Sequence, residues 1–173
     1  MKKLKLAAGL SLALLGSALG QQVLAQEPTV GVADESLFTD KDPVKHKNKQ
    51  AALHIMRELL QCNHWSDAGN WLTDKYIQHN PNAASGLQGV ITFFTTVMKR
   101  QPTATCDKLT TPIVAVLADG DYVTVVIPRE YDHPVNKGQK YSTTWFDMWR
   151  FVDGKADEHW DPATITPPAP AAR

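Results

Sequence analysis

The sequence predicts an α+β fold in which helices cover one face of a curved antiparallel sheet. Apolar residues recur at helical spacing in the first part of the chain, up to about residue 99. After Cys106 they alternate with polar residues, as they do in half-buried strands. The 173 residues are enough for one domain, so one layer of helices on one sheet would bury both patterns.

The N-terminus has the pattern of a secretory signal peptide. Met1–Lys5 is basic, an apolar run continues to about Gly20, and Val23–Ala25 offers the small residues that precede cleavage. We therefore expect a signal peptide over residues 1–25 and a periplasmic or secreted protein. A buried or membrane-spanning helix is the alternative, but the run is shorter than the about 20 apolar residues that a bilayer requires. No Cys follows the cleavage position, so no membrane anchor is expected.

Composition narrows the classes of partner. Removal of Lys2, Lys3 and Lys5 with the signal peptide leaves 15 basic against 18 acidic side chains, a net charge of −3 with neutral His. The mature chain of 148 residues thus lacks the basic footprint of a nucleic-acid-binding protein. Cys62 and Cys106 could form a disulfide or stay as two buried thiols. Neither has a partner at zinc-ligand spacing, so no metal site is expected.

Three helices are expected in the first part of the mature chain. Residues 26–42 are polar and irregular and are expected to form a flexible lead. Asp42-Pro43 has the residue types of a helix N-cap and a first helical position, which predicts a helix over 43–62. A short helix over 66–72 and a third helix over 86–99 follow.

The rest of the chain is expected to form strands. The segment Tyr76–Asn82 should be extended and run into a turn, because Asn-Pro disfavours helix. The tail over residues 166–173 is rich in Pro and is expected to be disordered. The antiparallel strands are predicted from the alternation of apolar residues over 110–118, 122–129, 141–152 and from the Asp153-Gly154 turn to about 164.

Side-chain alternation across the Asp153-Gly154 turn predicts a polar cluster. Trp145, Asp147 and Trp149 share one side of their strand, and His159 and Asp161 share one side of the next. If those sides coincide, two carboxylates and an imidazole lie among large aromatic rings, a composition typical of a pocket. The alternative is that Asp161 ends its strand by bonding local backbone N–H groups, and that His159 is an ordinary sheet residue.

The order and spacing of six motifs over residues 45–164 resemble the SnoaL-like polyketide cyclases of the nuclear transport factor 2-like superfamily. The resemblance implies a SnoaL-like domain over 43–165. It also implies a cone-shaped barrel, in which a curved antiparallel sheet and three helices enclose one deep pocket, often in a homodimer. The motifs are Tyr76–Pro81, Phe93-Phe94, the hairpin Val116–Val123, Asp147–Arg150, Gly154-Lys155 and Glu158–Asp161.

The resemblance also implies a function. SnoaL-like cyclases close a ring by an intramolecular aldol reaction without metal or cofactor, and by position their general acid/base is Asp161. Asp147 and His159 are the other candidate catalytic residues, and a small hydrophobic carbonyl compound is the expected partner. The alternative function is a non-catalytic module that binds a small molecule or another protein. The candidate substrate-binding residues are Tyr76, His79, Asn80, Phe93, Phe94, Trp145 and Trp149.

Overall fold

The computed structural model of the chain describes residues 27–165. The predicted signal peptide and the Pro-rich tail over 166–173 lie outside the described residues. In the part that is described, no helix has both the length and the apolar character needed to cross a membrane.

The three predicted helices are confirmed close to their predicted positions. The first is α1 (Pro43–His54), which continues directly as the π-helix η2 (Ile55–Gln61). Asp42 caps α1 by accepting hydrogen bonds from the N–H groups of Val44 and Lys45. The second is the 3-10 helix η3 (Trp65–Asn70), and the third is α2 (Leu87–Thr92), continued by the π-helix η4 (Phe93–Val97).

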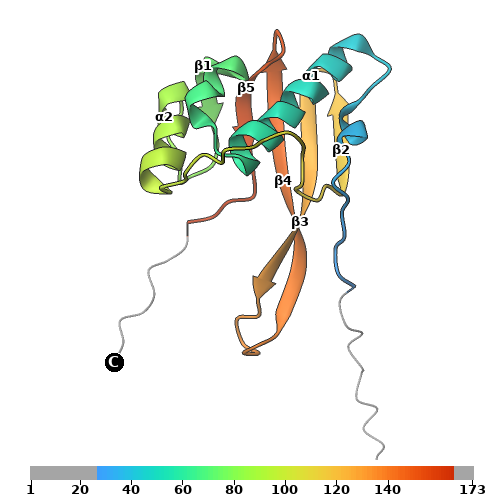
Figure 1. Ribbon diagram of the computed structural model, residues 1–173, viewed down its shortest axis with the longest axis vertical. Coiled ribbons are helices and arrows are strands. Elements are labelled where there is room, and N and C mark those ends of the chain that lie inside the picture. The colour runs from blue at the N-terminus through green and yellow to red at the C-terminus, as the bar shows by residue number, and fades with distance from the viewer. Residues whose placement is uncertain (1–26, 166–173) are drawn as a thin grey trace, which may run out of the picture.

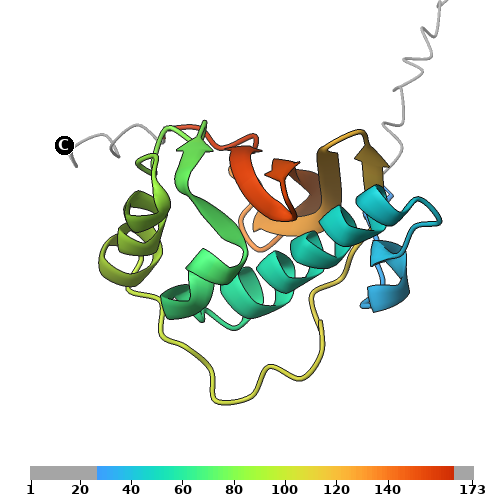
Figure 2. The ribbon, with the colours of Figure 1, turned by 90° about the horizontal axis from the view of Figure 1, so that it is seen from above.

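Five strands form one mixed sheet in the order β1-β5-β4-β3-β2. All neighbouring pairs are antiparallel except β1 and β5, which run parallel. Figure 2 shows the helices on one side of this sheet, with α1 lying along its face. The strands are β1 (Leu72–Gln78), β2 (Ala115–Asp119), β3 (Tyr122–Asp132), β4 (Lys140–Val152) and β5 (Lys155–Trp160).

Strand β1 corrects the predicted architecture in two ways. The prediction of a purely antiparallel sheet built only after Cys106 was wrong, because β1 joins the sheet in parallel with β5. The second helix also ends earlier than predicted, since Leu72 begins β1 rather than ending η3. Parallel pairing joins segments about 80 residues apart without a turn, so no local sequence pattern announces it.

The hairpin of β3 and β4 is longer than predicted and projects beyond the other strands (Figure 1). Its strands pair without interruption from Tyr122↔Arg150 to Asp132↔Lys140. The far half of this hairpin, residues 128–144, is called the arm below. Only the near half lies under the helices, and the arm extends away from them (Figure 1).

The lead segment is also different from the prediction. Residues 26–42 were expected to be flexible, but the described part packs on the domain. The 3-10 helix η1 (Glu35–Phe38) buries Phe38 completely, and Val32 bridges to Ile113 near the start of the sheet. The segment contributes a large apolar side chain to the core, which the polar composition around Phe38 concealed.

The cysteines form a disulfide, which resolves the alternative that the sequence left open. Cys62, at the end of η2, is bonded to Cys106, in the long connection to β2. The bond therefore ties the helical layer to the segment that enters the sheet. The core lies between the same two layers and includes Met56, Leu59 and Trp149, each at most 2% exposed.

Candidate functional site

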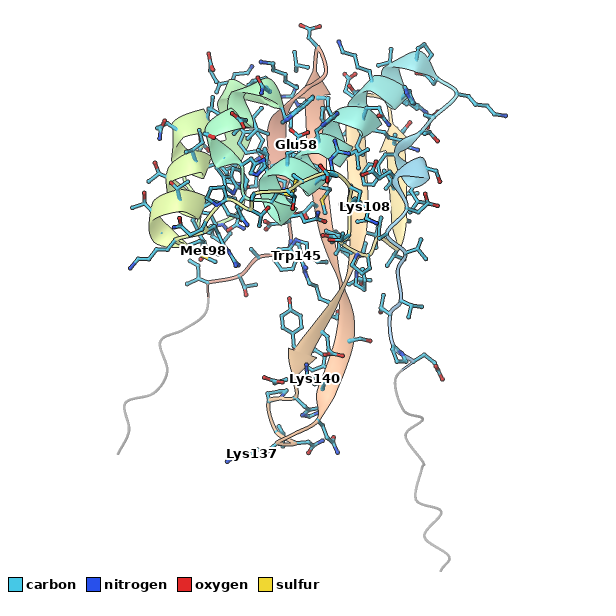
Figure 3. The ribbon with its side chains drawn as sticks, in the orientation of Figure 1. Glu58, Met98, Lys108, Lys137, Lys140 and Trp145 are labelled. Atoms are coloured by element: carbon cyan, nitrogen blue, oxygen red, sulfur yellow. A yellow bond between two sulfur atoms is a disulfide. The ribbon has the colours of Figure 1, made fainter. Side chains whose placement is uncertain are left out.

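A cavity of about 1340 Å³ lies between the inner face of the sheet and the helical layer. Its walls are mostly apolar and aromatic, with aliphatic side chains from η2. Figure 3 labels two lining residues, Met98 just beyond η4 and Trp145 where the arm leaves the sheet. All five aromatic residues predicted to bind substrate line this cavity: Tyr76, Phe93, Phe94, Trp145 and Trp149.

Asp147 and His159 form a buried pair on the cavity wall. The register of the sheet places His159 on β5 opposite Trp149 on β4, two residues from Asp147 on the same face. His159 Nε2 lies 3.2 Å from Asp147 Oδ1, and each residue is 6% exposed. Trp145 Nε1 donates a hydrogen bond to the same carboxylate oxygen at 3.0 Å. The second oxygen, Oδ2, makes no hydrogen bond to any residue in the described range.

Gln78 determines where the protons of this pair lie. Its side-chain oxygen accepts a hydrogen bond from the backbone N–H of Asn80 at 3.0 Å, which fixes the orientation of the amide. The same oxygen lies 2.8 Å from His159 Nδ1, so Nδ1 must carry a hydrogen. A neutral His159 would then present a lone pair at Nε2 to the Asp147 carboxylate. The contact is a hydrogen bond only if one further proton lies between Nε2 and Oδ1.

Asp161 belongs to the same cluster. One ligand atom from each of Asp147, His159 and Asp161 lies within 4.8 Å of the others, so the two carboxylates and the imidazole lie close together. This spacing would also allow the three side chains to hold a metal ion. Both oxygens of Asp161 are occupied, however. Asn80 Nδ2 donates to Oδ2 at 2.7 Å, and the backbone N–H of Ala163 donates to Oδ1 at 2.9 Å.

The local bond to Ala163 is the strand-end turn that the sequence offered as the alternative reading of Asp161. Asp161 borders a shallow pocket on the outer face of the sheet rather than the main cavity. Asp147 is therefore the carboxylate of the cluster that lines the main cavity, and its Oδ2 makes no hydrogen bond within the described range.

Tyr76 on β1 places a neutral hydroxyl beside the cluster. Its oxygen accepts a hydrogen bond from Trp149 Nε1 at 3.1 Å, and the side chain is 3% exposed. Burial raises the pKa of the Tyr76 hydroxyl well above its ordinary value, and the nearby charges of Asp147 and Asp161 raise it further. The hydroxyl hydrogen has no acceptor within the described range, so it remains available to a ligand.

The predicted polar pair His79 and Asn80 divides between two places. Asn80 reaches the cluster through Asp161. His79 does not line the cavity, because its ring stacks on Trp160 at 4.9 Å and its Nε2 lies 2.8 Å from Glu158. Consecutive residues at the end of β1 point to opposite sides, and this separates the two.

The lining residues that sequence reasoning missed include Gln78, Arg100 and Arg129. Gln78 shares a side of β1 with Tyr76 and would have been found if that segment had been recognised as a strand. Arg100 and Arg129 lacked any motif, and only the cavity unites them.

The comparison with protein families matches the SnoaL-like domain to residues 54–159, more than half of the chain. The chain therefore belongs to the SnoaL-like family. This agrees with the resemblance in its motifs and with the cavity between helices and a curved sheet. A comparison with curated proteins found no match.

Two solved structures have a similar fold. A protein assigned as a SnoaL-like polyketide cyclase from Jannaschia sp. CCS1 is 20% identical over 72% of this chain and 91% of its own, with a TM-score of 0.50. A protein assigned as a polyketide cyclase from Bacillus cereus ATCC 10987 is 17% identical over 81% of this chain and 89% of its own, also with a TM-score of 0.50. At these identities the likeness supports the fold alone.

Proposed function

We propose that the protein is an enzyme that moves a proton at a carbon next to a carbonyl group of a small apolar compound. The reaction class is an aldol-type ring closure or a related isomerisation. The observation that carries the proposal is the Asp147–His159 pair, which is buried in an apolar cavity and leaves one carboxylate oxygen unoccupied. Membership of the SnoaL-like family supports the same class of reaction.

In this proposal Asp147 is the general base. Oδ2 removes the proton from the carbon, and the C–H electron pair forms an enolate whose oxygen accepts a hydrogen bond from the Tyr76 hydroxyl. In a ring closure the enolate carbon then attacks a second carbonyl of the same molecule. A new C–C bond forms, and the resulting alkoxide takes the proton back. In an isomerisation the proton returns to a different carbon.

His159 holds the Asp147 carboxylate in position through the contact at Oδ1. With its Nδ1–H held by Gln78, it can present a second N–H to Asp147 Oδ1, while Trp145 donates to the same oxygen. Both bonds leave Oδ2 as the oxygen that faces the ligand. Asp161 is a second carboxylate in reach of the cluster, and Asn80 holds it in place.

Export and dimer formation are proposed on separate grounds. The disulfide between Cys62 and Cys106 supports an oxidising compartment, in line with the predicted signal peptide. The homodimer rests on the resemblance to the family, and light scattering of the mature protein would measure it.

Deuterium exchange tests the proposed chemistry. The mature protein, residues 26–173, is incubated in heavy water with a simple cyclic ketone, and loss of the α-proton signal is followed by NMR. Asp147→Asn keeps the size of the side chain but cannot accept the proton, so the exchange rate should fall about 10²- to 10⁴-fold. Asp119→Asn, an exposed residue at the end of β2, is the matched control.

Two outcomes would contradict the proposal. If Asp147→Asn exchanges the probe as fast as Asp119→Asn, Asp147 is not the base. If a chelator abolishes exchange, a bound metal ion enolises the ketone and the metal-free mechanism is wrong. Binding of the probe without any exchange would favour the alternative function, a non-catalytic binding module.

A further inference from the structure

The arginines of the described range fall into two kinds. Arg57 and Arg150 each lie within 3.4 Å of two carboxylates and serve the structure as ion-pair partners. Arg100 and Arg129 have no ion-pair partner among residues 27–165. The two arginines without a partner are the two that line the cavity.

Within the described residues, no other charged side chain of the cavity lining pairs with them. Apart from the arginines, Asp147 and His159 are the acidic and imidazole side chains that line the cavity. The imidazole of His159 lies 3.2 Å from the Asp147 carboxylate, so Asp147 is already in contact with a polar group of the cavity wall rather than with either arginine. The lining therefore carries two guanidinium groups and one carboxylate, with Asp161 just outside it, although the mature chain is expected to be negative overall. A guanidinium is a planar array of donors that suits a carboxylate.

Arg129 lies along the inner face from the acid/base pair, with Trp145 between them. Asp147 and Thr143, the cross-strand neighbour of Arg129, are four residues apart on β4, a distance of about 13 Å along a strand. The Arg129 guanidinium reaches back to within 6.0 Å of the centre of the Trp145 ring. The gap between the guanidinium and the pair is therefore shorter than the strand distance. The Trp145 ring lies between the guanidinium and the pair.

We infer that the cavity binds a carboxylate-bearing apolar compound, with Arg129 as the carboxylate subsite and the apolar body lying over Trp145. Arg100 adds positive charge to the same cavity. The position of the reacting carbon at Asp147 rests on the proposed function, whereas the subsite itself depends only on the arginines. The inference gives the substrate class as an oxo acid whose carbonyl and carboxylate are separated by an apolar chain or ring system.

Two probes of the same shape test the subsite. Calorimetry compares 8-oxo-8-phenyloctanoic acid with its primary amide on the mature protein. The acid should bind about tenfold more tightly or better, because hydrogen bonds to a charged group are worth more than those to a neutral one. Added salt should reduce this preference. Arg129→Gln should remove most of it, and Arg100→Gln should reduce it.

The control is Lys137→Gln, which removes the same charge from the exposed tip of the arm, away from Trp145 (Figure 3). The inference is overturned if the acid binds no better than the amide or does not bind. It is also overturned if Arg129→Gln keeps the same preference as Lys137→Gln. Binding does not require turnover, so a failure here is distinguishable from a failure of the exchange experiment on Asp147→Asn.

Discussion

Gln78 offers a direct test of the proton arrangement at the site. Its side-chain oxygen accepts two hydrogen bonds, from the backbone N–H of Asn80 and from His159 Nδ1–H. Gln78→Leu replaces the carboxamide by an apolar side chain of similar size and removes the oxygen that accepts both bonds. Each lost hydrogen bond costs about 1 kcal/mol, and a buried donor left without a partner costs about 1–3 kcal/mol. We therefore expect a destabilisation of about 2 kcal/mol, measured by urea denaturation.

The position of the proton gives a more specific readout than stability. Without an acceptor at Nδ1, a neutral His159 can move its hydrogen to Nε2 and donate it to Asp147. Nitrogen-15 NMR of the imidazole should therefore report a protonated Nδ1 in the native protein and its loss in Gln78→Leu. Gln78→Glu keeps an acceptor oxygen in the same place and should retain the Nδ1 hydrogen. Identical ring nitrogen shifts in the native protein and Gln78→Leu would refute the assignment of the Nδ1 hydrogen to the bond with Gln78.

Two further predictions concern stability. Burial alone would raise the pKa of the Asp157 carboxyl, but the hydrogen bond from Thr73 and the pairing with Arg150 outweigh it and hold the pKa below its ordinary value of 3.8. The pKa of Asp157 is lower in the folded protein than in the unfolded chain. The stabilisation that the charged carboxylate provides is therefore complete above the unfolded value of 3.8 and is lost as the pH falls through the folded pKa. Asp157→Asn should therefore cost about 2 kcal/mol at pH 7 and progressively less in acid, by urea denaturation; an equal cost at every pH would contradict this. Replacement of Cys62 and Cys106 by Ser releases a loop with a sequence separation of 44 residues. It should lower the free energy of unfolding by up to about 4 kcal/mol, and an unchanged value would show that the bond does not form in the protein.

The local patterns of the chain were sufficient for most of the elements. Asp42-Pro43 marked the start of the first helix, and the two Asp-Gly turns marked the hairpins around β3 and β4. Alternation along β4 and β5 also predicted that Asp147 and His159 would share a side, and both line the cavity. These features depend on neighbours in sequence, so the sequence contains them directly.

Other features required contacts between distant segments. The parallel pairing of β1 with β5 brings Gln78 to His159, and no local pattern relates residues 81 positions apart. The burial of Phe38 likewise depends on the sheet below it.

The division of roles at the site follows the same rule. Alternation assigns each strand residue to a face, and so the sequence was sufficient to bring Asp147 and His159 together with Trp145 and Trp149. Only the tertiary structure decided which of them is free to act. Asp161 gives both oxygens to Asn80 and Ala163, whereas Asp147 keeps one, and this difference arises from hydrogen-bond partners on other segments of the chain.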